Sequence, residues 1–152
     1  MTGNQYLSSI LEEGFAISRR VLSSETIEGL RAALHGLDGD RGAYGRRNLL
    51  GRCPAVKAIT EAPEIRGLVE PILGGRAFPV RALLFDKLPG ANWGVAWHQD
   101  LTIAVKQRAD VDGFSAWTVK DGVPHVQPPV GVLEGMLTLR LHLDEADEDN
   151  GA

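Results

Sequence analysis

The sequence predicts an α+β fold, with residues 1–76 mainly helical and residues 77–152 mainly strands. In the first part, apolar residues recur at three- and four-residue steps, the period of an amphipathic helix. In the second part they alternate with polar residues or form β-branched and aromatic runs, as strands do. The 152 residues are 43% apolar and 24% charged, which predicts one globular domain spanning 1–152.

Two helices are predicted before residue 40. Leu7, Ile10 and Leu11 suit a short opening helix that Gly14 ends, and residues 15–18 then have the composition of a strand. A second helix begins at a cap provided by Ser23 or Ser24, and Glu25 complements its dipole. Its apolar positions fall on one face: Ile27, Leu30, Leu34 and Leu37.

A third helix is predicted to follow the glycine-rich and charged loop at residues 38–45. Pro63 suits its first turn, and the pair Gly74–Gly75 follows its last apolar residues. Pro71 lies inside the pattern, where the missing N–H and the proline ring predict a kink or an early end.

Strand signals dominate from residue 77 onward. The segments 77–87 and 95–100 are predicted strands, separated by a turn at Pro89–Gly90. Residues 106–130 mix glycine, aspartate and prolines with aromatic residues, which predicts a long loop over a site. In residues 137–143 leucines alternate with polar residues, the two-residue period of a strand with one apolar face.

Composition narrows the class of function. The net charge is −4 and the basic residues are scattered, so no stripe is expected to follow a nucleic-acid backbone. No apolar run approaches the roughly 18 residues of a membrane span, and the start lacks a signal-peptide pattern. We therefore expect a cytoplasmic protein without nucleic-acid or membrane partners. Cys53 is the only cysteine and is expected to be a small buried residue.

The segment around His98 carries the clearest chemical signal. In a strand, residues two apart point to the same face, so His98 and Asp100 would present an imidazole and a carboxylate side by side. Two histidines and one carboxylate form the facial triad of non-haem Fe(II) oxygenases, which leaves positions for an organic co-substrate and O2. We therefore interpret His98 and Asp100 as two of three metal ligands.

Four motifs, taken in order, resemble the phytanoyl-CoA dioxygenase family of Fe(II)- and 2-oxoglutarate-dependent oxygenases. They are Phe85-Asp-Lys-Leu-Pro-Gly, Trp97-His-Gln-Asp, Leu139-Arg-Leu-His-Leu-Asp and Asp149-Asn-Gly-Ala. The resemblance covers residues 15–152. It implies a double-stranded β-helix, or jelly-roll, buttressed by N-terminal helices, with His98 and Asp100 as metal ligands. It also implies hydroxylation of a small-molecule substrate with O2 and 2-oxoglutarate. Because Asp100 occupies the position where related halogenases have a small residue, hydroxylation is favoured over halogenation.

Two positions of the family have no match in the 152 residues. They are a distal histidine that completes the metal site and an arginine that binds the distal carboxylate of 2-oxoglutarate. Asn150–Gly151 is a hairpin signal followed only by Ala152. We therefore expect a jelly-roll that is incomplete and truncated in this chain, which alone should be inactive.

Each of the other candidate residues also has a structural interpretation. Lys87 and Arg140 could bind the co-substrate, or they could be solvated charges on strand edges. Trp117 and His125 could line a substrate pocket from the long loop, or pack within it. His142 could close the metal site, although an exposed position on its strand is the simpler expectation.

Two rival functions therefore stay open. The first is a non-catalytic jelly-roll that binds a partner or self-associates through open sheet edges. The second is a cupin-like metal dioxygenase whose third ligand is His142 or His125. The sequence does not identify the substrate.

Overall fold

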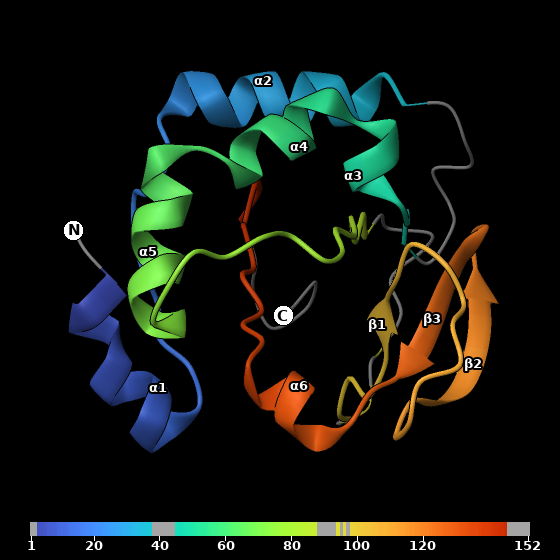
Figure 1. The fold of residues 1–152 in the computed structure, drawn as a ribbon. Coiled ribbons are helices and arrows are strands. Elements are labelled where there is room, and N and C mark those ends of the chain that lie inside the picture. The colour runs from blue at the N-terminus through green and yellow to red at the C-terminus, as the bar shows by residue number, and fades with distance from the viewer. Residues whose placement is uncertain (1–2, 38–44, 88–93, 95, 97, 146–152) are drawn as a thin grey trace. The chain divides into compact units, whose positions relative to one another are not determined.

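The computed structural model describes residues 3–37, 45–87, 94, 96 and 98–145 (Figure 1). The chain divides into two compact units. Unit 1 comprises Met1–Gly36 and Cys53–Pro79, and unit 2 comprises Leu37–Arg52 and Val80–Ala152. The predicted turns at Pro89–Gly90 and Asn150–Gly151, and most of the predicted loop 38–45, lie outside the described residues.

Unit 1 is helical within its described part. After a 3-10 turn η1 (Gly3–Tyr6) its helices are α1 (Leu7–Glu13), α2 (Ser24–His35), α4 (Pro54–Thr60) and α5 (Pro63–Leu73). η1 contacts α1 and α5, and α4 contacts α2 and α5. The buried apolar side chains of this unit come mainly from two helices and the residue before α4: Leu30, Leu34, Cys53, Ile65 and Leu68.

Local signals set the ends of these helices. Gly14 and Gly74 follow α1 and α5 in the left-handed conformation, with φ of 83° and 71°, which costs least at glycine. The Oγ of Ser23 accepts a hydrogen bond from the Thr26 backbone N–H at 3.1 Å. The three predicted helices are therefore confirmed, and α5 continues two residues beyond Pro71.

The predicted strand at residues 15–18 is wrong, because the segment leaves α1 as irregular chain. Within the described part of unit 1 all regular structure is helical, so this segment has no neighbouring strand to bond its backbone. A side-chain hydrogen bond joins it to η1 instead, between the Tyr6 hydroxyl and the Ser18 Oγ at 2.9 Å.

Replacing Ser23 with alanine should lower the free energy of unfolding by about 1 kcal/mol, because the Thr26 N–H loses its capping acceptor. Urea denaturation followed by circular dichroism measures the change. Ser24→Ala is the matched control, since Ser24 lies inside the helix. Equal losses in the two variants would exclude the cap as the cause.

Unit 2 contains the sheet. Its described elements are α3 (Leu49–Arg52), β1 (Ile103–Ala104), β2 (Ser115–Lys120), β3 (Val123–Gln127) and α6 (Val130–Glu134). The three strands pair antiparallel in the order β1-β3-β2, so β3 is central (Figure 1). Asp121 and Gly122 join β2 to β3 with φ of 52° and 73°, as a tight hairpin turn requires.

The structure corrects the predicted positions of the strands. The predicted loop 106–130 contains β2 and β3, because Asp121–Gly122 is a hairpin turn between two strand-forming runs. Segments 77–87, 95–100 and 137–143 form no strand in their described residues, apart from an isolated bridge between Leu84 and Arg46. Residues 137–143 have the strand period but no paired strand among the described residues, and a strand needs a hydrogen-bonded neighbour.

The described residues combine helices with a three-stranded antiparallel sheet, which is compatible with the predicted α+β class, and the sheet does not form a jelly-roll there. Val126 of β3 is fully buried, and Leu49 of α3 is almost so. Arg46 is also buried, and its guanidinium lies 4.0 Å from the Asp86 carboxylate. In the described part of the chain, no helix has the length and apolar character that crossing a membrane requires.

Candidate metal centre

His98 is exposed and lies in irregular chain. Its Nδ1 is 2.8 Å from the backbone oxygen of Ala96. A carbonyl oxygen only accepts hydrogen bonds, so Nδ1 carries the proton, and in the neutral ring Nε2 has the free lone pair. Histidines that bind metals commonly have this arrangement, because a hydrogen bond at one nitrogen fixes the tautomer and orients the other.

Asp100 also lies near the surface, with 64% of its side chain exposed. One carboxylate oxygen is 3.4 Å from a guanidinium nitrogen of Arg81. An ion pair with this much exposure contributes at most about 1 kcal/mol, so it does not prevent the carboxylate from binding another cation. The predicted strand at 95–100 is not formed in its described residues, so strand geometry does not place His98 and Asp100 on one face.

The side chains of His98 and Asp100 are of types that bind divalent cations, but they supply only two of the three ligands of a facial triad. An imidazole nitrogen and a carboxylate are two of the three ligand types of a facial triad. Among the described residues, no three histidine, cysteine, aspartate or glutamate side chains come together as a metal site. Neither His142, which is exposed, nor His125 completes the set there.

His125 lies in β3 and not in a loop, which corrects the sequence interpretation. The residue is 3% exposed, and its Nδ1 donates to the Val123 backbone oxygen at 2.9 Å. Its Nε2 is buried and has no hydrogen-bond partner among the described residues. Trp117 likewise lies in β2, half-buried, with the Arg108 guanidinium 5.6 Å from the centre of its ring. This distance is typical of a cation–π contact.

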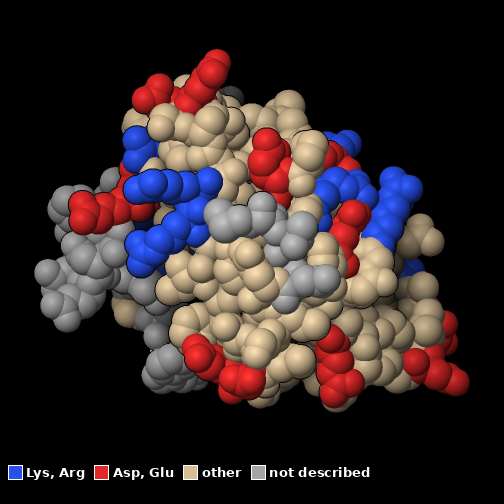
Figure 2. All heavy atoms as spheres, turned by 90° about the vertical axis from the view of Figure 1, so that its left-hand side faces the viewer, with Lys and Arg blue, Asp and Glu red and all other residues tan. Residues whose placement is uncertain are grey.

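The remaining candidates lie outside regular elements. Lys87 is half-buried in irregular chain, and Arg140 is exposed. Basic and acidic side chains stand close together on the face drawn in Figure 2.

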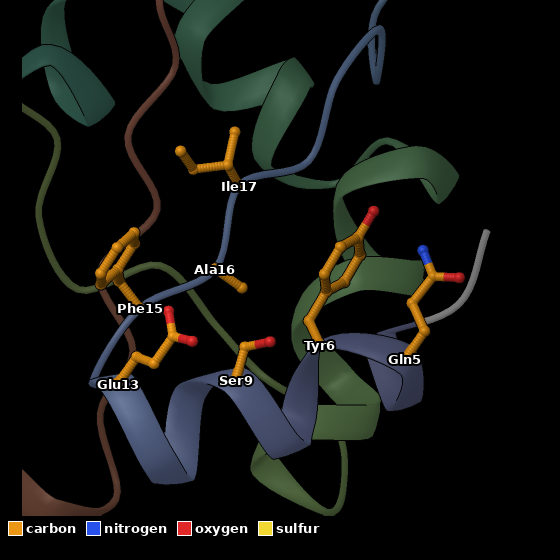
Figure 3. Close-up of a pocket in the computed structure, with 7 residues that line it drawn as sticks. All are labelled: Gln5, Tyr6, Ser9, Glu13, Phe15, Ala16 and Ile17. Atoms are coloured by element: carbon orange, nitrogen blue, oxygen red, sulfur yellow. The ribbon is translucent and has the colours of Figure 1, made fainter.

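Each unit has a hollow of its own. In unit 1, a broad and open one of about 480 Å³ lies between η1–α1 and the segment after α1, with Tyr6, Ser9, Glu13 and Phe15 around it (Figure 3). In unit 2, a smaller cavity of about 80 Å³ is bordered by several basic residues and by His125. Neither hollow is lined by His98, Asp100 or Trp117.

Arg47, Asn48 and Lys120, which line the smaller cavity, were missed by sequence reasoning. They come from separate segments, and no local pattern links them. Comparison of the chain with protein-family models, curated proteins and solved structures found no match.

Proposed function

We propose that this chain belongs to a cytoplasmic Fe(II)- and 2-oxoglutarate-dependent oxygenase of the phytanoyl-CoA dioxygenase type, which hydroxylates a small organic substrate with O2. His98 and Asp100 are two of its three metal ligands in this proposal. The fold we propose for the complete domain is the double-stranded β-helix. Support comes from the Trp97-His-Gln-Asp segment and its neighbouring motifs.

The observation that carries the proposal is the hydrogen bond between His98 Nδ1 and the Ala96 carbonyl oxygen. It leaves the Nε2 lone pair as the free donor of a solvent-exposed ring, two residues before an exposed carboxylate. This hydrogen bond favours the tautomer that a metal ligand at Nε2 needs, because the metal and the proton compete for the same nitrogen.

Bound Fe(II), together with 2-oxoglutarate and O2, would supply the oxidising power for hydroxylation. His98 would bind the metal through Nε2, and Asp100 would bind it through a carboxylate oxygen and neutralise part of its charge. Lys87 and Arg140 are our candidates for holding the carboxylates of 2-oxoglutarate, and Trp117 and His125 for lining the substrate pocket. No residue of this chain matches the family's distal histidine or its arginine, so we propose that the chain alone is inactive.

Anaerobic calorimetric titration with Fe(II) tests the proposal. We expect one weak, saturable site per chain, because two protein ligands hold a divalent ion less tightly than three. The absence of a saturable site would contradict the proposal.

The same titration separates the proposal from its metal-binding rival. If His142 or His125 closes a cupin-like site, then Fe(II) binding is tight, and His142→Ala or His125→Ala abolishes it. Under our proposal His142→Ala leaves the affinity unchanged, since the side chain is exposed and is not part of the pair. His125 is buried, so its variant is interpreted only if its melting curve matches that of the wild type.

Exposed apolar side chains favour a second candidate, a non-catalytic domain that assembles with a second copy. In unit 2, Val119 is 71% exposed and Val130 is 68% exposed. Val119 lies on β2, which is an edge of the described sheet. Such an edge offers unpaired backbone groups to another strand.

We therefore expect the isolated chain to self-associate as its concentration rises. Sedimentation velocity at several concentrations measures this, and Val119→Lys should shift the species toward monomer, because a charge on an edge strand opposes pairing. A wild-type chain that stays monomeric at all concentrations would exclude assembly through this edge.

A further inference from the structure

The small cavity of unit 2 brings together three basic side chains from different segments. Arg47 lies shortly before α3, and Lys120 is the last residue of β2. Arg81 is the second residue of the stretch Val80–Ala152. Its volume is about 80 Å³, several times the roughly 10–15 Å³ that one water needs. The space therefore suits a group of a few heavy atoms.

No aspartate or glutamate is among the described residues that line this cavity. Arg81 pairs with Asp100 at 3.4 Å, which compensates one of the three charges. Arg47 forms no ion pair within the described part of the chain, and the Lys120 ammonium donates only a long hydrogen bond, 3.5 Å, to the Thr102 hydroxyl. Like charges that border one hollow repel each other, and an anion bound there would reduce that repulsion.

Partial burial strengthens this attraction. The Arg81 side chain is 24% exposed and Lys120 is half-buried, so water screens these two charges less than on an open surface, whereas Arg47 is exposed. Apolar residues, among them Val80, Leu83 and Val123, form much of the remaining wall. His125 also lines the cavity, but its Nε2 is closed off from solvent and contributes no binding atom in this arrangement.

We propose that this cavity binds a small oxyanion group, a phosphate or a carboxylate, through Arg47, Arg81 and Lys120. Guanidinium and ammonium groups form charge-assisted hydrogen bonds with both kinds of oxygen, and the cavity is too small for a larger anionic body. The site requires no bound metal and does not depend on the proposed iron chemistry.

Titration of the isotope-labelled chain in metal-free buffer at constant ionic strength tests the site. The probes are inorganic phosphate in one series and acetate in the other, with backbone amide signals and the ring signals of His125 followed by NMR. We expect saturable shifts at Lys120, His125 and Ala104, which line the cavity, with at least one of the probes. The probe that saturates at the lower concentration identifies the phosphate or the carboxylate source.

Variants then assign the shifts to the basic residues. Arg47→Gln and Lys120→Gln should each weaken the binding about tenfold, whereas Lys120→Arg retains the charge and should stay within about twofold. Arg76→Gln and Lys57→Gln are the matched controls, because both residues belong to unit 1 and neither lines the cavity.

Three results would overturn the proposal: shifts that do not saturate with either probe, shifts spread over the surface, or equal weakening by the control variants. The first corresponds to a cavity that holds water only. If a glutamine variant does not fold, the saturation of the shifts in the wild-type chain tests the proposal.

Discussion

Replacement of Val126 with aspartate should abolish the folded sheet of unit 2. Val126 is 0% exposed and lies in β3, which pairs with both β1 and β2. Burying an unpaired carboxylate costs several kcal/mol, a large part of the ~5–15 kcal/mol by which a domain is stable. The loss of dispersed NMR signals from β2 and β3 would report the unfolding. The milder Val126→Ala should destabilise by about 2 kcal/mol.

Val119→Asp is the matched control for this variant. It introduces the same charge into the neighbouring strand at a side chain that is 71% exposed, so the expected change is within about 0.5 kcal/mol. A Val126→Asp variant that keeps its sheet signals and melts like the wild type would show that β3 is not the centre of this unit.

The second large effect is the loss of metal binding when either proposed ligand is removed. His98→Ala and Asp100→Ala should each weaken Fe(II) binding by at least about 10- to 100-fold, because removal of partners that only support a ligand already has such an effect. Neither variant should change stability much, since both side chains are exposed. Calorimetric titration gives the affinity, and thermal denaturation gives the stability.

His35→Ala and Asp110→Ala serve as controls of the same chemistry away from the proposed site. His35 ends α2, and Asp110 is exposed in the segment before β2. Their Fe(II) affinities should equal that of the wild type. If they weaken binding as much as His98→Ala does, then the metal binds nonspecifically to surface residues.

The helices could be predicted from the sequence because their signals are local. Ser23 caps α2 through a residue three positions away, and Gly14 and Gly74 end their helices by their own conformation. No distant residue needs to be known for these assignments. The short helices α3, α4 and α6 were not predicted. α3 and α6 have only four and five residues, too few to show an apolar period.

The strands depend on distant partners and were therefore misplaced. Asp121–Gly122 is a strong hairpin signal, but prolines follow it closely, and Pro124 lies within the central strand. Its carbonyl oxygen still accepts a hydrogen bond from the Val105 N–H at 3.0 Å, so only one donor is lost. Conversely, Leu139 and Leu141 have the strand period, yet both are exposed and unpaired in the described chain.

For the candidate site, the residue types could be predicted from the sequence, but their geometry could not. The residue types at His98 and Asp100 indicate metal binding without any structure, because histidine and carboxylate are the ligands of a facial triad. The hydrogen bond of His98 to Ala96 and the ion pair of Asp100 with Arg81 could not be predicted from the sequence. The cavity of Arg47, Arg81 and Lys120 was also not foreseen, since the fold alone brings these residues together.

The most direct test of the proposed metal pair is NMR of the labelled chain with substoichiometric Mn(II), a paramagnetic substitute for Fe(II) that broadens only nearby signals. We predict broadening centred on His98 and Asp100 that disappears in His98→Ala and persists in His142→Ala. Broadening that survives His98→Ala, or that centres on another group of residues, would contradict the assignment of His98 and Asp100 as metal ligands.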